Sequence, residues 1–118
     1  MSDVGVGIVG CGAFGCRYAE ALAGLSGVRL AHAVDPDPRR REEMRARFGV
    51  ERLSASVEGL CADPDVAAAI VVTPESAHRE ATVAALSSGR DVLVEKPLAT
   101  SEADAAAMVA AAEAAGRR

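Results

Sequence analysis

The sequence predicts a doubly wound α/β fold, in which a mostly parallel sheet of about five strands, ordered 3-2-1-4-5, carries helices on both faces. Short apolar runs alternate along the chain with segments of helical spacing, and almost no linker separates them. Half of the 118 residues are apolar but only 3% are aromatic, so alanine and valine must do most of the packing. Small side chains of this kind suit helices that lie close to a parallel sheet. We expect one domain, residues 1–118.

Chemical signals mark the ends of the elements in the first half of the chain. Gly24 and Gly49 follow segments of helical spacing, and glycine tolerates the left-handed conformation that ends many helices. Asp37 followed by Pro38 is typical of a helix N-cap and the first helical residue. The predicted elements are a strand over 4–9, a helix over 13–22, a strand over 28–34, a helix over 39–48, a short strand over 50–53, and a small helix capped by Ser56 that runs through Cys61.

The second half of the chain repeats the alternation of strand and helix. The pair at 63–64, Asp-Pro, breaks the small helix, and Pro74 suits the first turn of the next one. Residues 101–104 are typical of a capping box that opens an alanine-rich helix, which stops at Gly116. The predicted elements are a buried strand over 66–72, a helix from Pro74 to about Ser87, a strand over 91–94 and a helix over 101–115.

Residues 10–15 have the pattern G-x-G-x-x-G, directly after the first apolar run and before the first helical segment. A dinucleotide site needs this order. Gly10 permits the tight turn out of a buried strand, and Gly12 lets backbone approach a pyrophosphate. Gly15 lets the helix lie close to the strand, so that the first N–H groups of the helix face the phosphates. The pattern alone leaves open a glycine-rich turn of no function.

Asp35 stands about 20 residues beyond the last of these glycines, at the end of the second apolar run. It should accept hydrogen bonds from both hydroxyls of an adenosine ribose, and its charge would repel a 2′-phosphate, which favours NAD over NADP. Arg39 or Arg40, one turn later, would partly offset that repulsion. The arginine run is, however, more typical of a solvated helix face than of a phosphate clamp. Asp35 as a simple turn residue before proline is a further alternative.

Glu95, Lys96 and Pro97 follow the fifth predicted strand, at the edge of the sheet where ligands bind. An ammonium group there would donate to a substrate oxygen beside a nicotinamide ring and help to move its proton as hydride leaves. Pro97 fixes the backbone direction, for which a cis bond is one route. On position alone, Lys96 is equally well explained as an exposed lysine paired with Glu95.

The histidines and cysteines carry weaker signals. His78 lies in the first turn of the helix after the fourth strand, where position alone favours a helix-surface residue, and His32 lies within a strand as a structural residue. Cys11 occupies a position in the glycine-rich turn that needs only backbone, and Cys16 and Cys61 fall within helices. Because no pair of cysteines has metal-ligand spacing, we expect neither a metal site nor a catalytic cysteine.

Composition excludes several classes of protein. The formal net charge of −4 and the scarcity of aromatic residues argue against a nucleic-acid surface, with the cluster at 39–41 as the one basic exception. An odd number of cysteines, three, without an evident signal peptide indicates a reducing compartment rather than a disulfide framework. No apolar stretch is long enough to span a bilayer. We therefore expect a cytoplasmic protein that binds neither nucleic acid nor membrane.

Four stretches together resemble the Gfo/Idh/MocA oxidoreductases, the family of glucose-fructose oxidoreductase and inositol dehydrogenase. The Glu-Lys-Pro and Thr-Pro-x-x-x-His signals are far more specific than the glycine pattern, which other dinucleotide enzymes share. The resemblance covers essentially the whole chain, but only the cofactor-binding domain of the family. The stretches are Val-Gly-Ile-Val-Gly-Cys-Gly-Ala-Phe-Gly at 6–15, Val-Asp-Pro-Asp at 34–37, Val-Val-Thr-Pro-Glu-Ser-Ala-His at 71–78, and Val-Leu-Val-Glu-Lys-Pro-Leu-Ala at 92–99.

The resemblance implies roles for individual residues. It makes Lys96 the catalytic residue and brings His78 in as a residue beside the cofactor. The Asp35 charge makes NAD the expected cofactor, with NADP less favoured, and Arg40 is counted among the cofactor-binding residues because of its position one turn later. By resemblance, Gly10, Gly12, Ala13, Phe14 and Gly15 hold the pyrophosphate, Asp35 holds the ribose, Thr73, Pro74 and His78 flank the nicotinamide half, and Glu95, Lys96 and Pro97 line the junction between cofactor and substrate.

The sequence also departs from the family pattern. Family enzymes continue into a sixth strand and a second domain that supplies the substrate pocket, whereas this sequence ends at Arg118. We therefore expect the substrate domain to be absent and the fifth strand to be left as a sheet edge, which tends to find a partner. The expected result is a homo-oligomer or reduced stability.

Two functional hypotheses follow. In the first, the chain is the cofactor-binding part of an oxidoreductase that transfers hydride between NAD(P) and a sugar, polyol or similar secondary alcohol, with a second domain or chain completing the site. In the second, it is a stand-alone NAD-binding or assembly module without turnover. The presence of Lys96 favours the first hypothesis, and the expected absence of a substrate domain favours the second.

Overall fold

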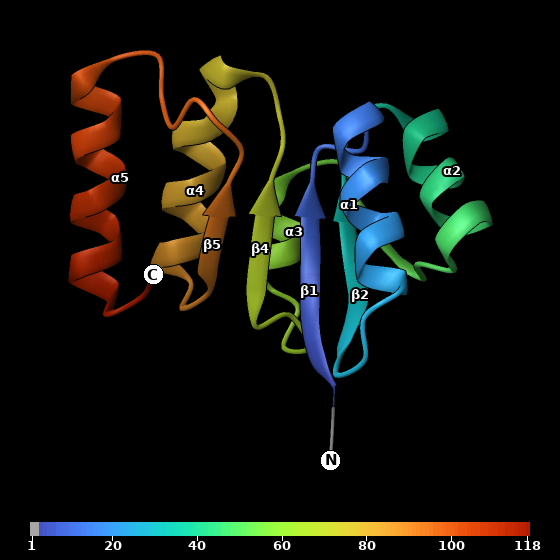
Figure 1. The fold of residues 1–118 in the computed structure, drawn as a ribbon. Helices are drawn as coiled ribbons and strands as arrows, with labels where there is room; N and C mark the ends of the chain where they lie inside the picture. Colours follow the sequence, from blue (N-terminus) through green and yellow to red (C-terminus); the bar gives the residue numbers. More distant parts are fainter. Residues whose placement is uncertain (1–2) are drawn as a thin grey trace.

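Five parallel strands form one sheet in the order β3-β2-β1-β4-β5, which confirms the predicted topology. The computed structural model describes residues 3–118. Figure 1 shows that the labelled strands all have their carboxyl ends at the same end of the sheet. The elements are β1 (Val4–Val9), α1 (Ala13–Ala23), β2 (Val28–Val34), α2 (Pro38–Phe48), β3 (Arg52–Ser54), α3 (Val57–Cys61), β4 (Ala68–Val71), a 3₁₀ turn (Glu75–Ala77), α4 (His78–Ser87), β5 (Asp91–Val94) and α5 (Glu102–Ala115).

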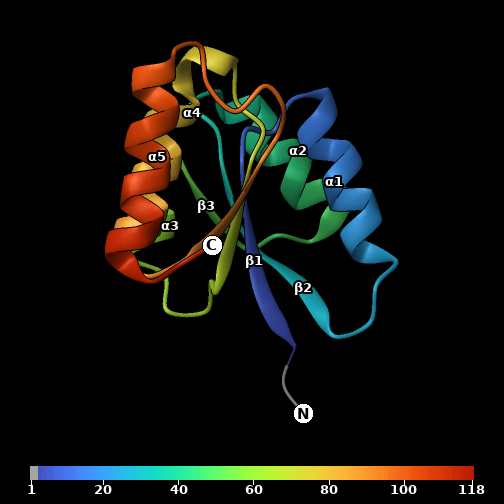
Figure 2. The ribbon, with the colours of Figure 1, turned by 60° about the vertical axis from the view of Figure 1, so that its left-hand side comes forward.

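Helices cover both faces of the sheet, as predicted. Helices α1 and α2 lie on one face, and α3, α4 and α5 lie on the other, which is clearest in the turned view of Figure 2. Each interface has its own apolar cluster, one around Ile8 and Met44 and the other around Leu60 and Val71. The core side chains are mostly alanine, valine and other aliphatic residues, so the helices approach the sheet closely.

Two strands differ from their predicted bounds. β3 begins at Arg52 rather than at residue 50, because Val50 is buried in the core and pairing with β2 starts only where Arg52 lies opposite His32. β4 covers Ala68–Val71 rather than the whole apolar run over 66–72. Its first apolar residue, Val66, instead donates its N–H to the carbonyl of Asp63 in a turn.

Three helix boundaries also differ. Gly24 caps α1 with a right-handed φ of −88°, and the left-handed glycine lies later, at Gly27. Ser56 is the N-cap residue of α3, but its side chain makes no capping hydrogen bond. Pro74 lies before a 3₁₀ turn, and α4 itself begins at His78. The expected caps at Asp37 and at the start of α5 are confirmed by hydrogen bonds from backbone N–H groups.

β5 is an edge strand, as expected from the order of the sheet. Its outer side is partly paired by residue 118 of the same chain, because the N–H of Val92 donates to the carbonyl of Arg118 at 2.7 Å. The N–H of Arg118 in turn donates to the Asp91 carboxylate at 2.9 Å. Among residues 3–118, no helix has the length and apolar character needed to cross a membrane.

We predict that Gly15→Ala destabilises the fold by roughly 1–3 kcal/mol, the usual cost of overpacking. A Cβ at Gly15 would overlap the carbonyl oxygen of Gly10 and lie 3.6 Å from Ile8 Cγ2, so α1 would have to move away from β1. Urea denaturation measures the change. Gly24→Ala is the matched control, because its Cβ would meet only the carbonyl of Ala21 at 3.6 Å. Equal stability of the two variants would contradict the close contact of α1 with β1.

Candidate functional site

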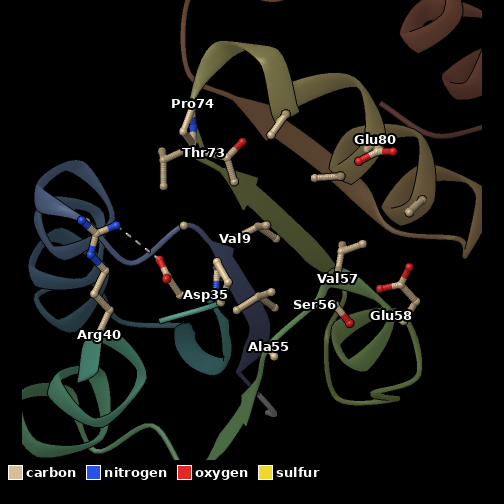
Figure 3. Close-up of a pocket in the computed structure, with 18 residues that line it drawn as sticks. Val9, Asp35, Arg40, Ala55, Ser56, Val57, Glu58, Thr73, Pro74 and Glu80 are labelled. Carbon is tan, nitrogen blue, oxygen red and sulfur yellow. Dashed lines mark ion pairs between the residues drawn. The ribbon is translucent and has the colours of Figure 1, made fainter. Parts of the chain in front are cut away.

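A groove of about 680 Å³ lies at the carboxyl ends of β1, β2 and β4. This is the edge at which doubly wound sheets bind ligands, and β1 and β4 flank the point where the strand order reverses. Figure 3 shows Asp35 and Arg40 on one side of the groove, with Ser56 and Glu58 across from them. The lining residues are Val9, Gly10, Gly12, Val34, Asp35, Pro36, Arg40, Ala55, Ser56, Val57, Glu58, Val72, Thr73, Pro74, Ala77, Glu80, Ala81 and Ala84.

The glycine-rich loop forms the floor of the groove beside α1. Gly10 has a φ of +104°, and a Cβ there would lie 2.8 Å from the carbonyl oxygen of Val72, so the loop is pressed against the end of β4. Gly12 has open space beside it, since the nearest atom to its ideal Cβ is the Arg40 Nη1 at 3.7 Å. The first N–H groups of α1 have no acceptor within the described residues, because the first amide to bond is that of Cys16. The loop therefore offers amide donors and room for an anion.

Asp35 is 4% exposed and holds the glycine-rich loop in place. Its Oδ2 accepts the N–H of Cys11 at 2.8 Å, and its Oδ1 accepts the N–H of Asp37 at 2.8 Å. The bond to Asp37, two residues later, is the one that a simple turn residue would make. Asp35 therefore both stabilises its own turn and bonds the glycine-rich loop. A carboxylate has about four acceptor sites, and two remain for a ligand in the groove.

The three consecutive arginines have three different environments. The Arg39 side chain is 94% exposed and pairs only with Asp37, at 3.9 Å. Arg40 lines the groove, with its Nη1 3.9 Å from Asp35 Oδ2, as the dashed line in Figure 3 marks. Arg41 donates from Nη1 to the backbone carbonyl of Asp35 at 2.7 Å. A solvated helix face describes Arg39 and Arg40, whose side chains are 94% and 55% exposed, although Arg40 also lines the groove. It is wrong for Arg41, which bonds the backbone.

Thr73 brings an unsatisfied polar atom to the groove. Its Oγ1 is buried and has no hydrogen-bond partner among the described residues. A buried hydroxyl without a partner costs free energy, so such groups in native proteins usually mark a ligand or water site. Pro74 follows at the rim of the groove, as Figure 3 shows.

His78 is buried and does not line the groove. It is 1% exposed, so the prediction of a helix-surface histidine is wrong. Its Nε2 lies 2.9 Å from the carbonyl oxygen of Thr73, and its Nδ1 lies 2.9 Å from that of Pro97 and 3.2 Å from that of Leu98. His78 thus ties the loop after β4 to the loop after β5.

The Glu95 carboxylate accepts two hydrogen bonds, whereas the Lys96 side chain is exposed. The Tyr18 hydroxyl donates to Glu95 Oε2 at 2.7 Å, and the Lys96 backbone N–H donates to Oε1 at 3.0 Å. These two donors hold the pKa of the Glu95 carboxyl below its usual range. The exposure of the Lys96 side chain is what the alternative to a catalytic role predicts. Its ammonium group forms no ion pair among residues 3–118, although its charge also helps to lower the pKa of the Glu95 carboxyl. The Lys96–Pro97 peptide bond is cis.

The cysteine environments are those of structural residues. Burial, with the nearby Asp35 charge, raises the pKa of the Cys11 thiol to about 12, and the thiol donates to the Val34 carbonyl at 3.4 Å. Burial also raises the pKa of Cys16. All three cysteines, including Cys61, are free. Because the thiolate is the reactive form, Cys11 stays a protonated packing group.

The structure brings part of the predicted site together. Gly10, Gly12, Asp35, Arg40, Thr73 and Pro74 line the groove, and Ala13 lies in an adjoining hollow with Gly12 and Arg40. Phe14 is 56% exposed with the Arg17 guanidinium 5.2 Å from its ring centre, and Gly15 packs against β1. His78, Glu95, Lys96 and Pro97 do not line the groove.

Sequence reasoning missed the wall opposite Arg40. It is formed by the β3–α3 loop with the start of α3, residues 55–58, and by the side of α4 that carries Glu80. The Ser56 hydroxyl, together with the backbone N–H of Glu58, holds the pKa of the Glu58 carboxyl below its usual range. A polar segment directly after an edge strand was the available signal, because it too lies at a strand's carboxyl end.

Residues 4–118 match the family model GFO_IDH_MocA, an oxidoreductase family with an NAD-binding Rossmann fold. The inositol 2-dehydrogenase of Acidothermus cellulolyticus is 34% identical over 117 residues, which are 98% of this chain and 34% of that enzyme. GenD2 from gentamicin A biosynthesis, solved in complex with NAD, superposes with a TM-score of 0.92 at 35% identity over 99% of this chain and 33% of its own.

The WlbA dehydrogenase of Chromobacterium violaceum, solved with NADH and UDP-GlcNAcA, superposes with a TM-score of 0.93 at 29% identity, over 99% of this chain and 34% of its own. The chain spans about a third of the length of the curated relatives that it matches. A family model that covers nearly all of the chain agrees with the sheet order, the glycine-rich loop and the groove. The chain therefore belongs to the GFO_IDH_MocA oxidoreductase family and corresponds to its NAD-binding Rossmann domain.

Proposed function

We propose that this domain serves an oxidoreductase that transfers hydride between NAD and a sugar, polyol or similar secondary alcohol. The groove at the carboxyl ends of β1, β2 and β4 is the observation that carries the proposal, because it joins free helix N–H groups, a buried carboxylate and a buried hydroxyl. The substrate class follows the printed names of relatives such as inositol 2-dehydrogenase. Since the chain spans about a third of such relatives, we propose that further protein completes the substrate pocket.

The residues of the groove fit a dinucleotide. In the proposal, the N–H groups of Gly12, Ala13, Phe14 and Gly15 hold the pyrophosphate, for which Gly12 leaves space. The free acceptor sites of Asp35 take the ribose hydroxyls. Thr73 Oγ1 gains the partner that it lacks, with Pro74 beside it. The nicotinamide half then lies over the β4 and β5 side, toward Glu95, Lys96 and Pro97.

The proposed chemistry divides between cofactor and protein. NAD supplies a hydride acceptor, so a carbon that bears a hydroxyl group becomes a carbonyl carbon. The substrate hydroxyl must lose its proton in the same conversion, and we assign Lys96 Nζ, in its neutral amine form, to take up that proton, become an ammonium group and then release the proton to water. His78 acts as a positioning residue, because it fixes the loops that carry Thr73 and Pro97.

We also propose a cellular location and an oligomeric state. Three free cysteines support a reducing compartment and hence a cytoplasmic location. The edge position of β5 supports self-association of the protein as a homo-oligomer.

We predict that Asp35 sets the preference for NAD. Asp35→Asn removes the charge that repels a 2′-phosphate and weakens the bonds to the ribose hydroxyls, so the ratio of NAD to NADP affinity should fall roughly tenfold or more. Calorimetric titration with both dinucleotides gives this ratio, which is insensitive to a general loosening of the glycine-rich loop. An unchanged ratio would rule out Asp35 as the ribose contact.

The arginines provide a matched pair for the same titration. Arg40→Leu should lower the residual NADP affinity roughly threefold to tenfold, because its guanidinium is the cation in the groove. Arg39→Leu should leave it unchanged, since that side chain is 94% exposed. Equal effects of the two variants would mean that only the overall charge of α2 matters.

We predict that Thr73→Val lowers NAD affinity roughly threefold to tenfold, the value of one hydrogen bond. The change removes a buried hydroxyl that has no partner within the described chain, so the stability of the unliganded protein should not fall. Thr82→Val is the matched control, because Thr82 Oγ1 is equally buried and unpartnered but Thr82 does not line the groove. Loss of NAD affinity in both variants, or in neither, would count against Thr73 as a contact.

Lys96 is tested in the polypeptide that naturally carries this domain, with a polyol or sugar oxidised under NAD saturation. Lys96→Met and Lys96→Arg should both lower kcat by roughly 10²–10⁴, because neither side chain exchanges a proton near neutral pH. The dissociation constant for NAD should stay within about twofold of the wild type, since Lys96 does not line the groove. Full activity of Lys96→Arg would show that charge alone is needed and would sink the proton-transfer role.

A further inference from the structure

A chain of three hydrogen bonds, buried at its His32 end and exposed at its Ser56 end, leads to the wall of the groove that faces Arg40. His32, on β2, is 5% exposed, and its Nδ1 lies 2.8 Å from Asp63 Oδ2. Its Nε2 lies 2.9 Å from Ser54 Oγ, at the end of β3. Ser54 Oγ in turn donates to the backbone carbonyl of Ser56 at 3.0 Å. The chain thus runs from a buried carboxylate to a residue of the groove lining.

The donors and acceptors of this chain fix its direction. Burial raises the pKa of Asp63, but hydrogen bonds from His32 and the Asp65 N–H, with the Arg52 charge, leave it below its usual range, so the carboxylate only accepts. His32 Nδ1 therefore carries a proton. The carbonyl of Ser56 also only accepts, so the single hydroxyl proton of Ser54 goes to it. The Nε2 atom of His32 is the other partner of Ser54 Oγ, 2.9 Å away.

Ser54 is tied to the groove through its backbone as well. Its carbonyl accepts the N–H of Asp35 at 3.1 Å. Ser54 therefore bonds both Asp35 and, through its hydroxyl, the opposite wall. Gly59 lies close to the Ser54 side chain. A Cβ on Gly59 would lie only 2.6 Å from Ser54 Oγ and 3.7 Å from His32 Nε2. This packing leaves the hydroxyl little space for another rotamer. The Ser54 hydroxyl therefore bonds the β3–α3 wall, residues 55–58, at the carbonyl of Ser56, which also accepts the N–H of Gly59 at 3.3 Å.

We propose that Ser54 and His32 are positioning residues that set the affinity of the groove for the adenosine half of NAD, through the hydrogen bond from Ser54 to Ser56. This inference rests on the proposed function. The wall lies on the β2 and β3 side of the sheet, with Asp35, whereas the proposed function puts the nicotinamide half toward β4 and β5. A loosened wall should therefore weaken the binding of ligands that contain the adenosine half and leave the binding of nicotinamide mononucleotide unchanged.

The test compares Ser54→Ala with the wild type by calorimetric titration with NAD, AMP and nicotinamide mononucleotide. Ser54→Ala should weaken NAD and AMP by roughly threefold to tenfold, as expected for one neutral hydrogen bond, and leave the mononucleotide unchanged. Ser54→Thr keeps the hydroxyl and should restore AMP affinity. Ser88→Ala is the matched control, because it deletes a hydroxyl that donates to a backbone carbonyl, that of Ala85 at 2.8 Å, and neither Ser88 nor Ala85 lines the groove.

The outcomes separate the two proposals. Absence of NAD binding by the wild type would overturn the proposed function and this inference with it. NAD binding by the wild type with unchanged AMP affinity in Ser54→Ala would overturn the inference alone. Equal loss of affinity for AMP and for nicotinamide mononucleotide in Ser54→Ala would also overturn the inference, since a general loss of structure would have that effect. Selective loss of AMP affinity with rescue by Ser54→Thr is the expected result.

Discussion

The hydrogen bond from the Cys11 N–H to the Asp35 carboxylate joins the two parts of the site on which the rest depends. It fixes the glycine-rich loop at the end of β1 to the end of β2, while Gly10 presses the same loop against β4. The first turn of α1 is thereby aimed along the groove, with its N–H groups free. An apolar residue at position 35 would remove the acceptor of the Cys11 N–H and so loosen the loop.

The other loops at the carboxyl ends of the strands are held by hydrogen bonds from polar side chains, of which the two histidines are buried. His78 ties the loops after β4 and β5 through backbone carbonyls, and His32 with Ser54 holds the loop after β3. Neither histidine reaches the groove lining. Loops normally carry function because a rigid scaffold positions them, and in this domain imidazole rings supply much of that connection.

The sequence was sufficient to predict the sheet order, most element bounds and six of the groove residues, because glycine spacing and the ends of apolar runs follow directly from backbone sterics. It was insufficient where a side chain's partner lies far along the chain. The burial of His78, the bond between Tyr18 and Glu95, and the wall formed by residues 55–58 depend on which loops meet in space. The divergent environments of Arg39, Arg40 and Arg41 depend likewise on how α2 faces the groove.

The most direct test of the account is a map of backbone amide chemical shifts in the ¹⁵N-labelled protein as NAD is added. We expect the largest changes at the amides of residues 11–15, at Asp37 and along residues 55–58, with those at the opposite edge of the sheet, such as Gly27 and Gly89, unmoved. Saturable shifts confined to that set would establish the groove as the NAD site. Shifts centred elsewhere, or none at saturating NAD, would contradict the central claim.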